Sequence, residues 1–548
     1  MITLHSITRT RWFATSLCTF FILISLANIP RAHAESVQGL VELQSPRAQA
    51  QENQVLIDLD WSRAQAQAPK IEGFADLHSH LMAEHTFGGS WFWGTVEGPI
   101  DWALRRCDGN LNQSHAAVEN LPGVAEFIAT DTGIHLGKRR GYDRRKCKKV
   151  FGITIPGTCP RPHFEHWPRH DGLAHQQMWN GHLKQAFDGG MKLMVVSLAE
   201  SNFLCRNTPS SKRKYNCDEM SSVNRQIDKL TQFVNNHSSW VGIARSPSEA
   251  RTLVSQNKLA LVVAVEVSNL FPTGSITSQL DQLYNKGVRS VQLVHHHNNR
   301  FSGAAPIPRL VQTVGLVEAL KGEMSPINNV SCGSNCDGDT NLNTQGLTSD
   351  GSTLVNAMVD RGMLVDVAHV SRKALVSIDS ILSQRNNYPM FYSHAHLFDS
   401  IDGNKDKRNE KYITSNEISL INASGGMVGL RTGLEAANTY GGSVGNYCDG
   451  SIRSFAQSLM AGVDQGLSIG FGADLNGFIT QMKPRCYPNS DPATQGIQRK
   501  GLAHVGLLPE LMLDLQNIGV PQRYLDHLGG SAERFVSMWE RAVLISGQ

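Results

Sequence analysis

Short apolar runs alternate with amphipathic stretches along most of the chain from residue 73 onward, and this alternation constrains the fold more than any other feature. The apolar runs have the length of buried strands, and the stretches between most of them have helical spacing. Strands that alternate with helices predict a parallel sheet, because parallel strands need long crossover connections. The predicted strands are residues 74–80, 192–198, 259–266, 289–295, 363–369, 389–394, 426–431 and 468–474.

This number of predicted strands favours an α/β fold of the (β/α)8 TIM-barrel type, with an open doubly wound sheet as the alternative. Residues 81–190 separate the first two strands by far more than an ordinary crossover, so we expect an inserted cap or loop region after the first strand. The last part of this insertion, residues 175–187, has the spacing of a helix that faces a core. Helical spacing is also clear at residues 224–234, 278–286, 352–360 and 453–460.

The N-terminus has the pattern of an export signal. Arg9 and Arg11 precede an apolar run from Trp12 to Ile29, and Ala32 and Ala34 supply small residues at the spacing of a cleavage site. The apolar run is about long enough to span a bilayer, so an uncleaved N-terminal membrane anchor is the alternative. The small residues favour cleavage.

Cleavage at that site would divide the chain into residues 1–34 as a signal peptide, residues 35–72 as a polar N-terminal extension and residues 73–548 as the barrel. We expect the mature protein to be periplasmic or secreted, without stable membrane insertion. The basic run at residues 138–149 is typical of a solvated loop. Because the net charge is only +3, we do not expect nucleic acid as a partner.

Export predicts an oxidising compartment, in which cysteines pair as disulfides. Cys18 leaves with the signal peptide, so nine of the ten cysteines remain in the mature chain. For the pair Cys332–Cys336, a metal site is the alternative to a disulfide. Local spacing suggests the pairs Cys147–Cys159, Cys205–Cys217, Cys332–Cys336 and Cys448–Cys486, with Cys107 left over.

Histidines and acids recur at the carboxyl ends of the predicted strands, the edge at which parallel barrels carry their chemistry. His78 and His80 lie two residues apart on the first strand, so both side chains point to the same side and can reach one ion. Each of these groups alone could be a buried polar group with a partner, but a barrel would bring all of them to one edge. Later strands end in Glu266, His369, His394 and Asp474.

Together these side chains predict a site for two metal ions. The histidine pair of the first strand would bind one ion, His369 and His394 the other, and Glu266 would bridge them. Mixed imidazole and carboxylate ligands suit Zn2+ best among the common ions. Two ions that share a hydroxide can polarise a substrate carbonyl. Asp474 would take the proton of that hydroxide and deliver it to the leaving amine.

Several further segments carry a family resemblance in series: residues 346–352 (GLTSDGS), 358–371 (MVDRGMLVDVAHVS), 392–395 (YSHA), 425–430 (GGMVGL), 470–477 (GFGADLNG) and 528–535 (LGGSAERF). They resemble the renal (membrane) dipeptidase family of the amidohydrolase superfamily. The resemblance covers the chain from residue 73 onward except the insertion, and is strongest after residue 259.

This resemblance implies zinc ligands at His78, His369 and His394, with Glu266 bridging two ions. It also implies that His295 faces the substrate carbonyl or the tetrahedral intermediate. Arg408 matches the residue that holds the terminal carboxylate of the substrate, and a guanidinium fork suits that group. The alternative for Arg408 is a solvated loop charge.

The chain departs from the family pattern at three places. His80 stands where the first strand usually has aspartate, Val267 follows the bridging acid where glycine is usual, and the last strand reads Asp-Leu-Asn rather than Asp-Phe-Asp. Histidine is a competent ligand, so His80 should change the charge and affinity of the metal site rather than abolish it. These changes affect the expected substrate range more than the metal chemistry.

A run of three histidines leaves open which ring faces the site. Alternation along a strand predicts that His295 and His297 share one side and that His296 points away. His396, two residues beyond His394, is a competing ligand, and the resemblance favours His394.

We therefore expect an exported metal-dependent hydrolase, a dipeptidase that cleaves dipeptide amide bonds with a hydroxide bridging two zinc ions. Its substrate would be a short peptide or amide with a free carboxylate, and a homodimer is left open. One alternative keeps the metal site but acts on N-acyl amino acids, lactones or other amides. A second alternative is an inactive barrel that acts as a binding or surface protein.

Overall fold

A computed structural model describes residues 69–104, 149–150, 153–154, 168, 170, 172, 175–206, 210–305, 329–331, 341–400, 410–435, 437–440, 444–486 and 496–548. The chain divides into the units Met1–Asp60 and Trp61–Gln548, and every described residue belongs to the second. Several predictions concern residues outside these ranges: the signal peptide, most of the N-terminal extension, Cys107, Cys147, Cys159, Cys332, Cys336 and Arg408.

Within the described residues, eight parallel strands close a barrel, which confirms the predicted fold class. The first strand pairs with β4 on one side and with β14 on the other, and β10 pairs with β11, so the eight strands form a closed barrel and not the open alternative. The barrel strands are β1 (Phe74–Ser79), β4 (Met191–Glu200), β6 (Leu259–Val267), β7 (Val288–Gln292), β10 (Leu364–Asp366), β11 (Met390–Leu397), β13 (Met427–Arg431) and β14 (Ile469–Gly472).

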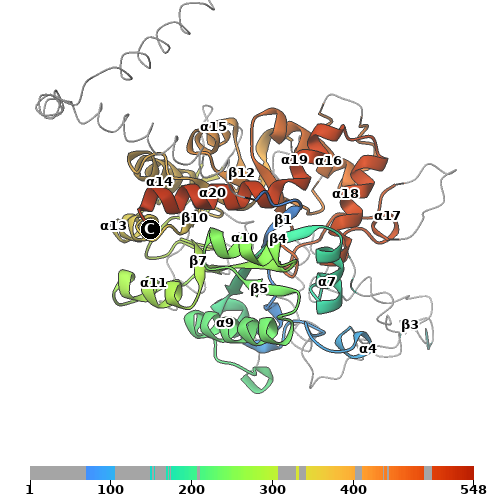
Figure 1. The fold of residues 1–548 in the computed structure, drawn as a ribbon. Coiled ribbons are helices and arrows are strands. Elements are labelled where there is room, and N and C mark those ends of the chain that lie inside the picture. The colour runs from blue at the N-terminus through green and yellow to red at the C-terminus, as the bar shows by residue number, and fades with distance from the viewer. Residues whose placement is uncertain are drawn as a thin grey trace, which may run out of the picture. The chain divides into compact units, whose positions relative to one another are not determined.

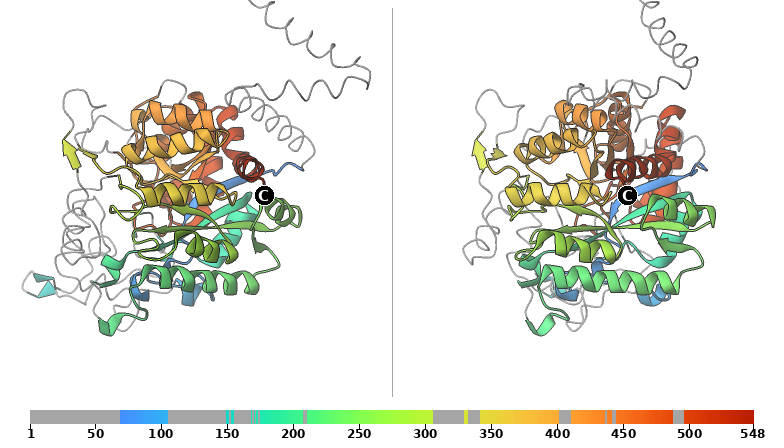
Figure 2. Two further views of the ribbon diagram at one scale, coloured as in Figure 1. Left: turned by 90° about the vertical axis from the view of Figure 1, so that its left-hand side faces the viewer. Right: turned by 60° about the vertical axis from the view of Figure 1, so that its left-hand side comes forward.

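Helices surround these strands (Figures 1 and 2). Several begin at a serine whose hydroxyl accepts a backbone N–H of the first turn, as Ser246 does from Glu249 and Ser371 from Ala374. The longer helices are α7 (Asn180–Asp188), α9 (Glu219–Asn236), α10 (Pro247–Ser255), α11 (Ile276–Asn285), α13 (Ser349–Val359), α14 (Arg372–Gln384), α15 (Ser415–Ser424), α16 (Ile452–Asp464), α18 (Leu508–Asn517), α19 (Gln522–Gly529) and α20 (Ser531–Ser546).

Shorter elements complete the described chain. Two short strands extend the barrel sheet, because β5 (Val241–Ile243) pairs with β6 and β12 (Tyr412–Ile413) pairs with β11. The others are β2 (Lys149–Val150), β3 (Ile153–Thr154), β8 (Asn329–Ser331), β9 (Asn341–Asn343), α4 (Ile100–Ala103), α8 (Asn202–Arg206), α17 (Ile497–Lys500), and the 3-10 turns η3 (Ala83–His85), η4 (Phe87–Gly89), η7 (Ser210–Lys212), η8 (Phe398–Ser400) and η10 (Val505–Leu507).

The connection from β1 to β4 is long, as the sequence predicts. Its last part is α7, which buries Leu183, Ala186 and Phe187 as the predicted core-facing spacing requires, although the helix begins at Asn180 and not at residue 175. Its first part packs Phe87 and Trp91 in a small apolar cluster separate from the main core. This connection begins directly after the paired histidines of the first strand.

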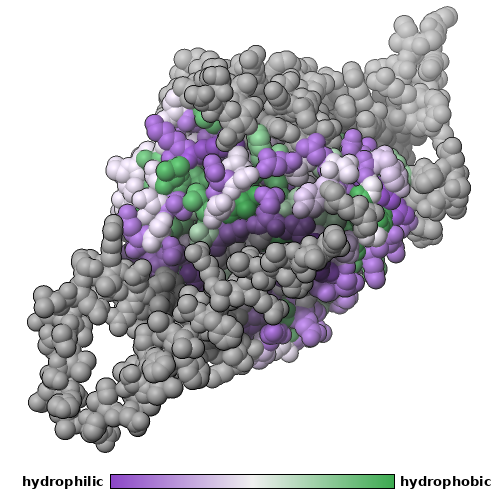
Figure 3. Space-filling view, turned by 90° about the horizontal axis from the view of Figure 1, so that it is seen from above, coloured by the Kyte–Doolittle hydropathy of each residue, from purple (hydrophilic) through white to green (hydrophobic). Residues whose placement is uncertain are grey.

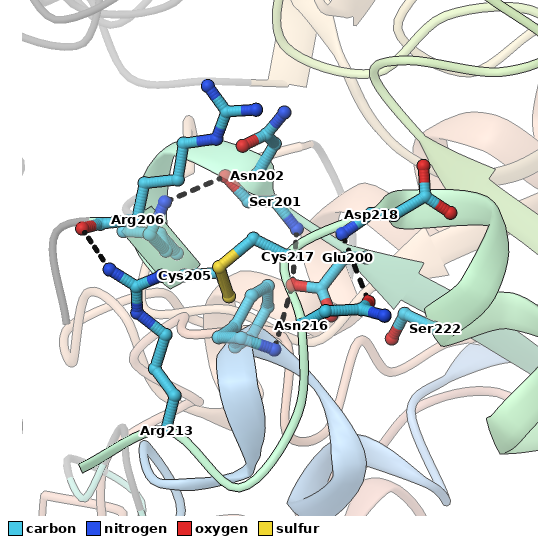
Figure 4. Close-up of a disulfide and its surroundings, with 12 residues drawn as sticks. Glu200, Ser201, Asn202, Cys205, Arg206, Arg213, Asn216, Cys217, Asp218 and Ser222 are labelled. Carbon is cyan, nitrogen blue, oxygen red and sulfur yellow. Dashed lines mark hydrogen bonds between the residues drawn. A yellow bond between two sulfur atoms is a disulfide. The ribbon is translucent and has the colours of Figure 1, made fainter. Parts of the chain in front are cut away.

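Two of the predicted disulfides fall within the described residues, and both are present: Cys205–Cys217 and Cys448–Cys486. The first lies beside Glu200, the last residue of β4 (Figure 4). The Oε1 atom of Glu200 accepts the backbone N–H of Phe87 at 2.8 Å and that of Ser201 at 3.0 Å. Glu200 therefore joins the end of β4 to the segment that follows β1.

In the part of the chain that the structure describes, no helix combines the length and the apolar composition needed to cross a membrane. The described residues on the face shown in Figure 3 are mainly hydrophilic, and hydrophobic residues are scattered among them.

Candidate metal centre

The barrel brings the predicted site residues together around one buried carboxylate, Glu266 of β6. His78 lies in β1 and His394 in β11, while His369 and Asp474 follow the ends of β10 and β14. These positions are all at the carboxyl ends of the parallel strands, where barrel enzymes carry their active sites. Ligand atoms lie within 4.8 Å of one another in three groups: His78 with Glu266 and His394, His78 with His80 and Asp474, and His295 with His296 and His369.

The two oxygens of Glu266 face different sets of imidazoles. Oε2 lies 3.2 Å from Nε2 of His78 and 3.4 Å from Nε2 of His80. Oε1 lies 3.3 Å from Nε2 of His369 and 4.0 Å from Nε2 of His394. Nitrogens from the first strand thus gather at one oxygen, and nitrogens from β11 and the end of β10 gather at the other. A carboxylate in this position can bridge two ions.

These distances fit metal ligation. Two ligands of one tetrahedral zinc ion, each bonded at 2.0–2.1 Å, lie about 3.3 Å apart. The separations of His78, His80 and His369 from Glu266 are close to that value. The Nε2 atoms of His369 and His394 lie 2.8 Å apart, so these two rings also direct the same atom toward a common point. The donor set therefore fits one divalent ion beside each carboxylate oxygen.

The contacts of His80 identify which of its nitrogens is free to bind. Nδ1 lies 3.0 Å from the carbonyl oxygen of Ser197, which can only accept, so Nδ1 carries the proton. Nε2 faces two carboxylates, Glu266 and Asp474, at 3.4 and 3.2 Å. Without a cation, the lone pair on Nε2 of a neutral His80 would face two negative carboxylates. A metal cation bound between them would interact favourably with Nε2 and with both carboxylates.

Burial and charge set the protonation states of the centre. Burial lowers the pKa of His295 and His394 well below the usual range and that of His369 to about 4. Burial also disfavours the charged form of His78, but the charge and hydrogen bond of Glu266 outweigh it and raise the pKa of His78 to about 9. The pKa of Glu266 is held well below its usual range, against the effect of burial, by the charge of His78 and by hydrogen bonds from His369 and His78. A carboxylate among mainly neutral imidazoles is the state that metal binding requires.

Two further buried carboxylates hold the strand ends that carry the site. Oδ1 of Asp76 in β1 accepts the backbone N–H of Ala473, which precedes the last candidate residue, at 3.0 Å. Oδ1 of Asp366 in β10 accepts the N–H of Ala368 at 3.0 Å and of Ser393 at 3.1 Å. Each carboxyl group thus joins neighbouring strands next to candidate ligands. Burial raises the pKa of both, that of Asp76 to about 6.

Two site residues have a left-handed backbone that favours glycine. The φ angles are 64° at His369 and 51° at Asp474. Non-glycine residues adopt this conformation at a cost of about 1–3 kcal/mol, which persists where the surroundings impose it. The N–H of Asp474 donates to the carbonyl of His78 at 2.7 Å, and the carbonyl of His369 accepts the N–H of Ala305 at 2.7 Å.

The prediction for the histidine run is wrong in one respect. The rings of His295 and His296 stack with centroids 3.5 Å apart, and His296 lies with His295 and His369 instead of pointing away. The reason is that β7 ends at Gln292, so the alternation of a strand does not extend to these residues. His295 itself faces the centre, with Nε2 3.5 Å from Oε1 of Glu266.

Beside the centre lie two basic residues that the sequence pattern did not identify, Arg431 and Lys411, together with His396, the competing ligand. Arg431, the last residue of β13, places Nη2 3.6 Å from Oδ2 of Asp474. His396 places Nε2 3.2 Å from Oε2 of Glu435, so it faces this acid and belongs to none of the ligand groups above. Lys411 directly precedes β12. The pKa of His369 is lowered mainly by burial and to a smaller extent by the charge of Lys411. The signal for Arg431 in the sequence is a basic residue at the end of an apolar strand, and this signal alone does not distinguish it from a solvated charge.

Comparison with known families places this geometry in context. The sequence profile described as membrane dipeptidase (Peptidase family M19) matches residues 177–321 and 324–460, more than half of the chain. The chain belongs to the membrane dipeptidase family. The matched residues include Glu266, His369 and His394, whereas the strands that carry His78 and Asp474 lie outside them. The barrel geometry brings these two residues to the same edge as Glu266, His369 and His394.

Several solved structures are similar to this chain at low identity. A dipeptidase described as a metallopeptidase of family M19 is 16% identical, with a TM-score of 0.45 over 66% of this chain and 88% of the other. A metallopeptidase from Rhodobacter sphaeroides, liganded with a phosphinate mimic of the dipeptide L-Ala-D-Ala, is 15% identical, with a TM-score of 0.45 over 66% of this chain and 89% of the other. The probable dipeptidase PvdM from Pseudomonas aeruginosa is 16% identical, with a TM-score of 0.45 over 67% of this chain and 88% of the other. The comparison with curated proteins gave no significant match.

Family membership confirms the resemblance found in the sequence and makes the protein a metal-dependent hydrolase of the dipeptidase class. The residues around Glu266 fit a metal centre of that class, because they offer imidazole nitrogens and carboxylate oxygens at ligand spacing.

Proposed function

We propose that this membrane dipeptidase-family protein is exported and hydrolyses the amide bond of dipeptides with the aid of two zinc ions. The observation that carries the proposal is the division of imidazoles between the two oxygens of Glu266. His78 and His80 would hold one ion, His369 and His394 the other, with Glu266 between them. Two bound ions would supply an activated water and a Lewis acid for the substrate carbonyl.

Asp474 is the residue we assign to proton transfer. Its Oδ1 lies 3.2 Å from His80 and 3.9 Å from His78, so the carboxylate reaches the metal centre from the side of the first strand. Its Oδ2 is directed to Arg431 at 3.6 Å. A carboxylate placed there can accept a proton from the attacking water and return it to the leaving amine.

His295 is the residue we assign to the substrate carbonyl. Its Nε2 lies on the same side of Glu266 as His369, and its imidazole is kept neutral by burial. A neutral imidazole can donate one N–H to the oxygen on which negative charge develops. Arg408, which lies outside the described residues, remains our candidate for the terminal carboxylate of the substrate.

Metal analysis combined with hydrolysis tests the proposal. We expect the mature protein to contain two zinc ions per chain and to hydrolyse dipeptides, to lose hydrolysis with a chelator, and to regain it with zinc. Sequencing the N-terminus of the exported protein tests cleavage after residue 34. Fewer than two tightly bound ions, together with hydrolysis that is insensitive to chelator, would overturn the two-zinc mechanism.

Substrate comparison tests the carboxylate requirement separately. We expect dipeptides with a free C-terminus to be cleaved faster than their C-terminally amidated forms, because a guanidinium binds a carboxylate with two charged hydrogen bonds. Equal rates on both forms would remove this role from Arg408 and favour an amidohydrolase with broader substrates.

A further inference from the structure

Arg431 has an unusual environment for a guanidinium. Only 17% of its side-chain surface is exposed, yet it donates no hydrogen bond to any residue in the described part of the chain. Its Nε atom is buried and has no acceptor. The carboxylate of Asp474, at 3.6 Å, is too far for a hydrogen bond and acts through charge alone. A largely buried arginine with available N–H groups is costly unless an acceptor arrives.

The position of Arg431 is next to the reacting groups. It ends β13 and pairs in register with Gly472, two residues before Asp474. The other oxygen of Asp474 contacts His80 at the metal centre. The carboxylate of Asp474 therefore lies between the guanidinium of Arg431 and the metal centre. A substrate bound at the metal centre would place its substituents within reach of the N–H groups of Arg431.

A second cation lies on the same side. Lys411 precedes Tyr412, which pairs with His396 of β11. Burial, and after it the charge of Arg431, lowers the pKa of Lys411 to about 8. Burial also disfavours the charged form of Arg431, but the charges of Glu435 and Asp474 outweigh it and raise the pKa of Arg431, although neither acid accepts a hydrogen bond from it in the described part of the chain. A ligand oxygen beside Arg431 would therefore supply the acceptor that the described residues leave out.

We infer that Arg431 forms a carboxylate subsite beside the metal centre, and that it selects dipeptides with an acidic side chain. The subsite would accept a side-chain carboxylate in addition to the terminal carboxylate. A guanidinium fork favours such a group over an amide of the same shape because it can donate two charged hydrogen bonds. The inference rests on the proposed dipeptidase function and specifies its substrate class.

Isosteric substrates that differ only in charge provide the test. On the zinc-loaded mature protein, kcat/KM is measured for Ala-Glu against Ala-Gln and for Glu-Ala against Gln-Ala. We expect the acidic member of at least one pair to be preferred by about tenfold or more, the effect of one charged hydrogen-bonded contact. Arg431→Gln should reduce that preference to less than about threefold.

A matched control is Arg523→Gln, which removes an arginine whose side chain is 68% exposed and which pairs with Asp464 on the outer helices. This variant should keep the wild-type preference. Equal rates for acidic and amide substrates in the wild type would overturn the inference. An equal loss of kcat/KM for both members of a pair in Arg431→Gln would also overturn the inference, because Arg431 would then act only through Asp474.

Binding without turnover separates failure of the subsite from failure of the dipeptidase proposal. Calorimetry on the zinc-loaded protein compares N-acetylglutamate with N-acetylglutamine. If none of the four dipeptides is cleaved, the proposed function fails, while tighter binding of N-acetylglutamate that disappears in Arg431→Gln still supports the carboxylate subsite. Equal binding of the two compounds would overturn it.

Discussion

Nε2 of His80 lies 3.2 Å from Oδ1 of Asp474 and 3.4 Å from Oε2 of Glu266. One imidazole of the first strand thus contacts both the proposed bridging acid and the proposed proton carrier. Its Nδ1 is fixed by the carbonyl of Ser197, which leaves Nε2 to face the two carboxylates. His80 is therefore placed to affect metal content and proton transfer at once.

Replacement of His80 should separate these two roles. We expect His80→Ala to lower the zinc content from two ions to about one per chain, because one ion would lose a first-strand ligand while the ligands at Oε1 of Glu266 remain. Metal analysis of the purified variant after dialysis measures this. His396→Ala is the matched control, since His396 faces Glu435, and it should keep both ions. Two tightly held ions in His80→Ala would contradict its assignment as a ligand.

Replacement of Asp474 tests the proton carrier. We expect Asp474→Asn to lower kcat by about 10²–10⁴-fold, the usual contribution of a positioned acid–base group. Zinc content should stay largely intact, because Glu266 and the histidines remain. A fall in zinc content in parallel with kcat would show that Asp474 is mainly a ligand. Asp281→Asn, at an acid whose side chain is 53% exposed, should leave both measurements unchanged.

The fold follows from the sequence because each barrel strand is an apolar run long enough to be recognised. The run predicted at residues 259–266 is observed as Leu259–Val267, buried throughout, and the run at 74–80 as Phe74–Ser79. Closure of the sheet into a barrel could be expected from the number of apolar runs, since each run is followed by a helix or a long connection. The parallel barrel then brings residues that are hundreds of positions apart to one edge, as with His78 and Asp474.

Where the sequence was insufficient, the reason is local geometry. A strand over residues 289–295 predicts that His296 points away, but β7 stops at Gln292 and the ring of His296 stacks on that of His295. Arg431 could not be singled out because an arginine after a strand is often solvated. Only the folded barrel places Arg431 beside Asp474 and leaves its buried Nε without a hydrogen-bond acceptor.

The two observed disulfides should differ in their contribution to stability. Cys205–Cys217 closes a loop of 12 residues and Cys448–Cys486 one of 38. The chain entropy that a cross-link removes from the unfolded state grows with loop length, so replacing both cysteines of a pair by serine should cost about 3 kcal/mol for the first pair and about 4 kcal/mol for the second. Urea denaturation of the two double variants measures the difference. A larger loss for the shorter loop would show that native contacts outweigh the chain entropy.

Glu200 predicts a specific dependence of stability on pH. Burial, together with the charge of Glu219, raises the pKa of its carboxyl group to about 8, and Arg225 approaches it only to 3.8 Å. In the unfolded chain the group has its ordinary pKa of about 4.3. Between these values the folded state holds a proton that the unfolded state has lost, so stability falls as pH rises from about 5 to about 8.

Glu200→Gln should remove this dependence. The amide oxygen can still accept the N–H groups of Phe87 and Ser201, and the side chain no longer ionises. We expect the free energy of unfolding of the variant to match the wild type near pH 5 and to exceed it above pH 8 by a few kcal/mol at most, which is roughly the linkage energy of such a shift. Denaturant titrations at several pH values measure this, with Glu72→Gln at an exposed acid as the control. Parallel stability curves for Glu200→Gln and the wild type would mean that Glu200 is ionised in the folded protein and that Arg225 compensates its charge.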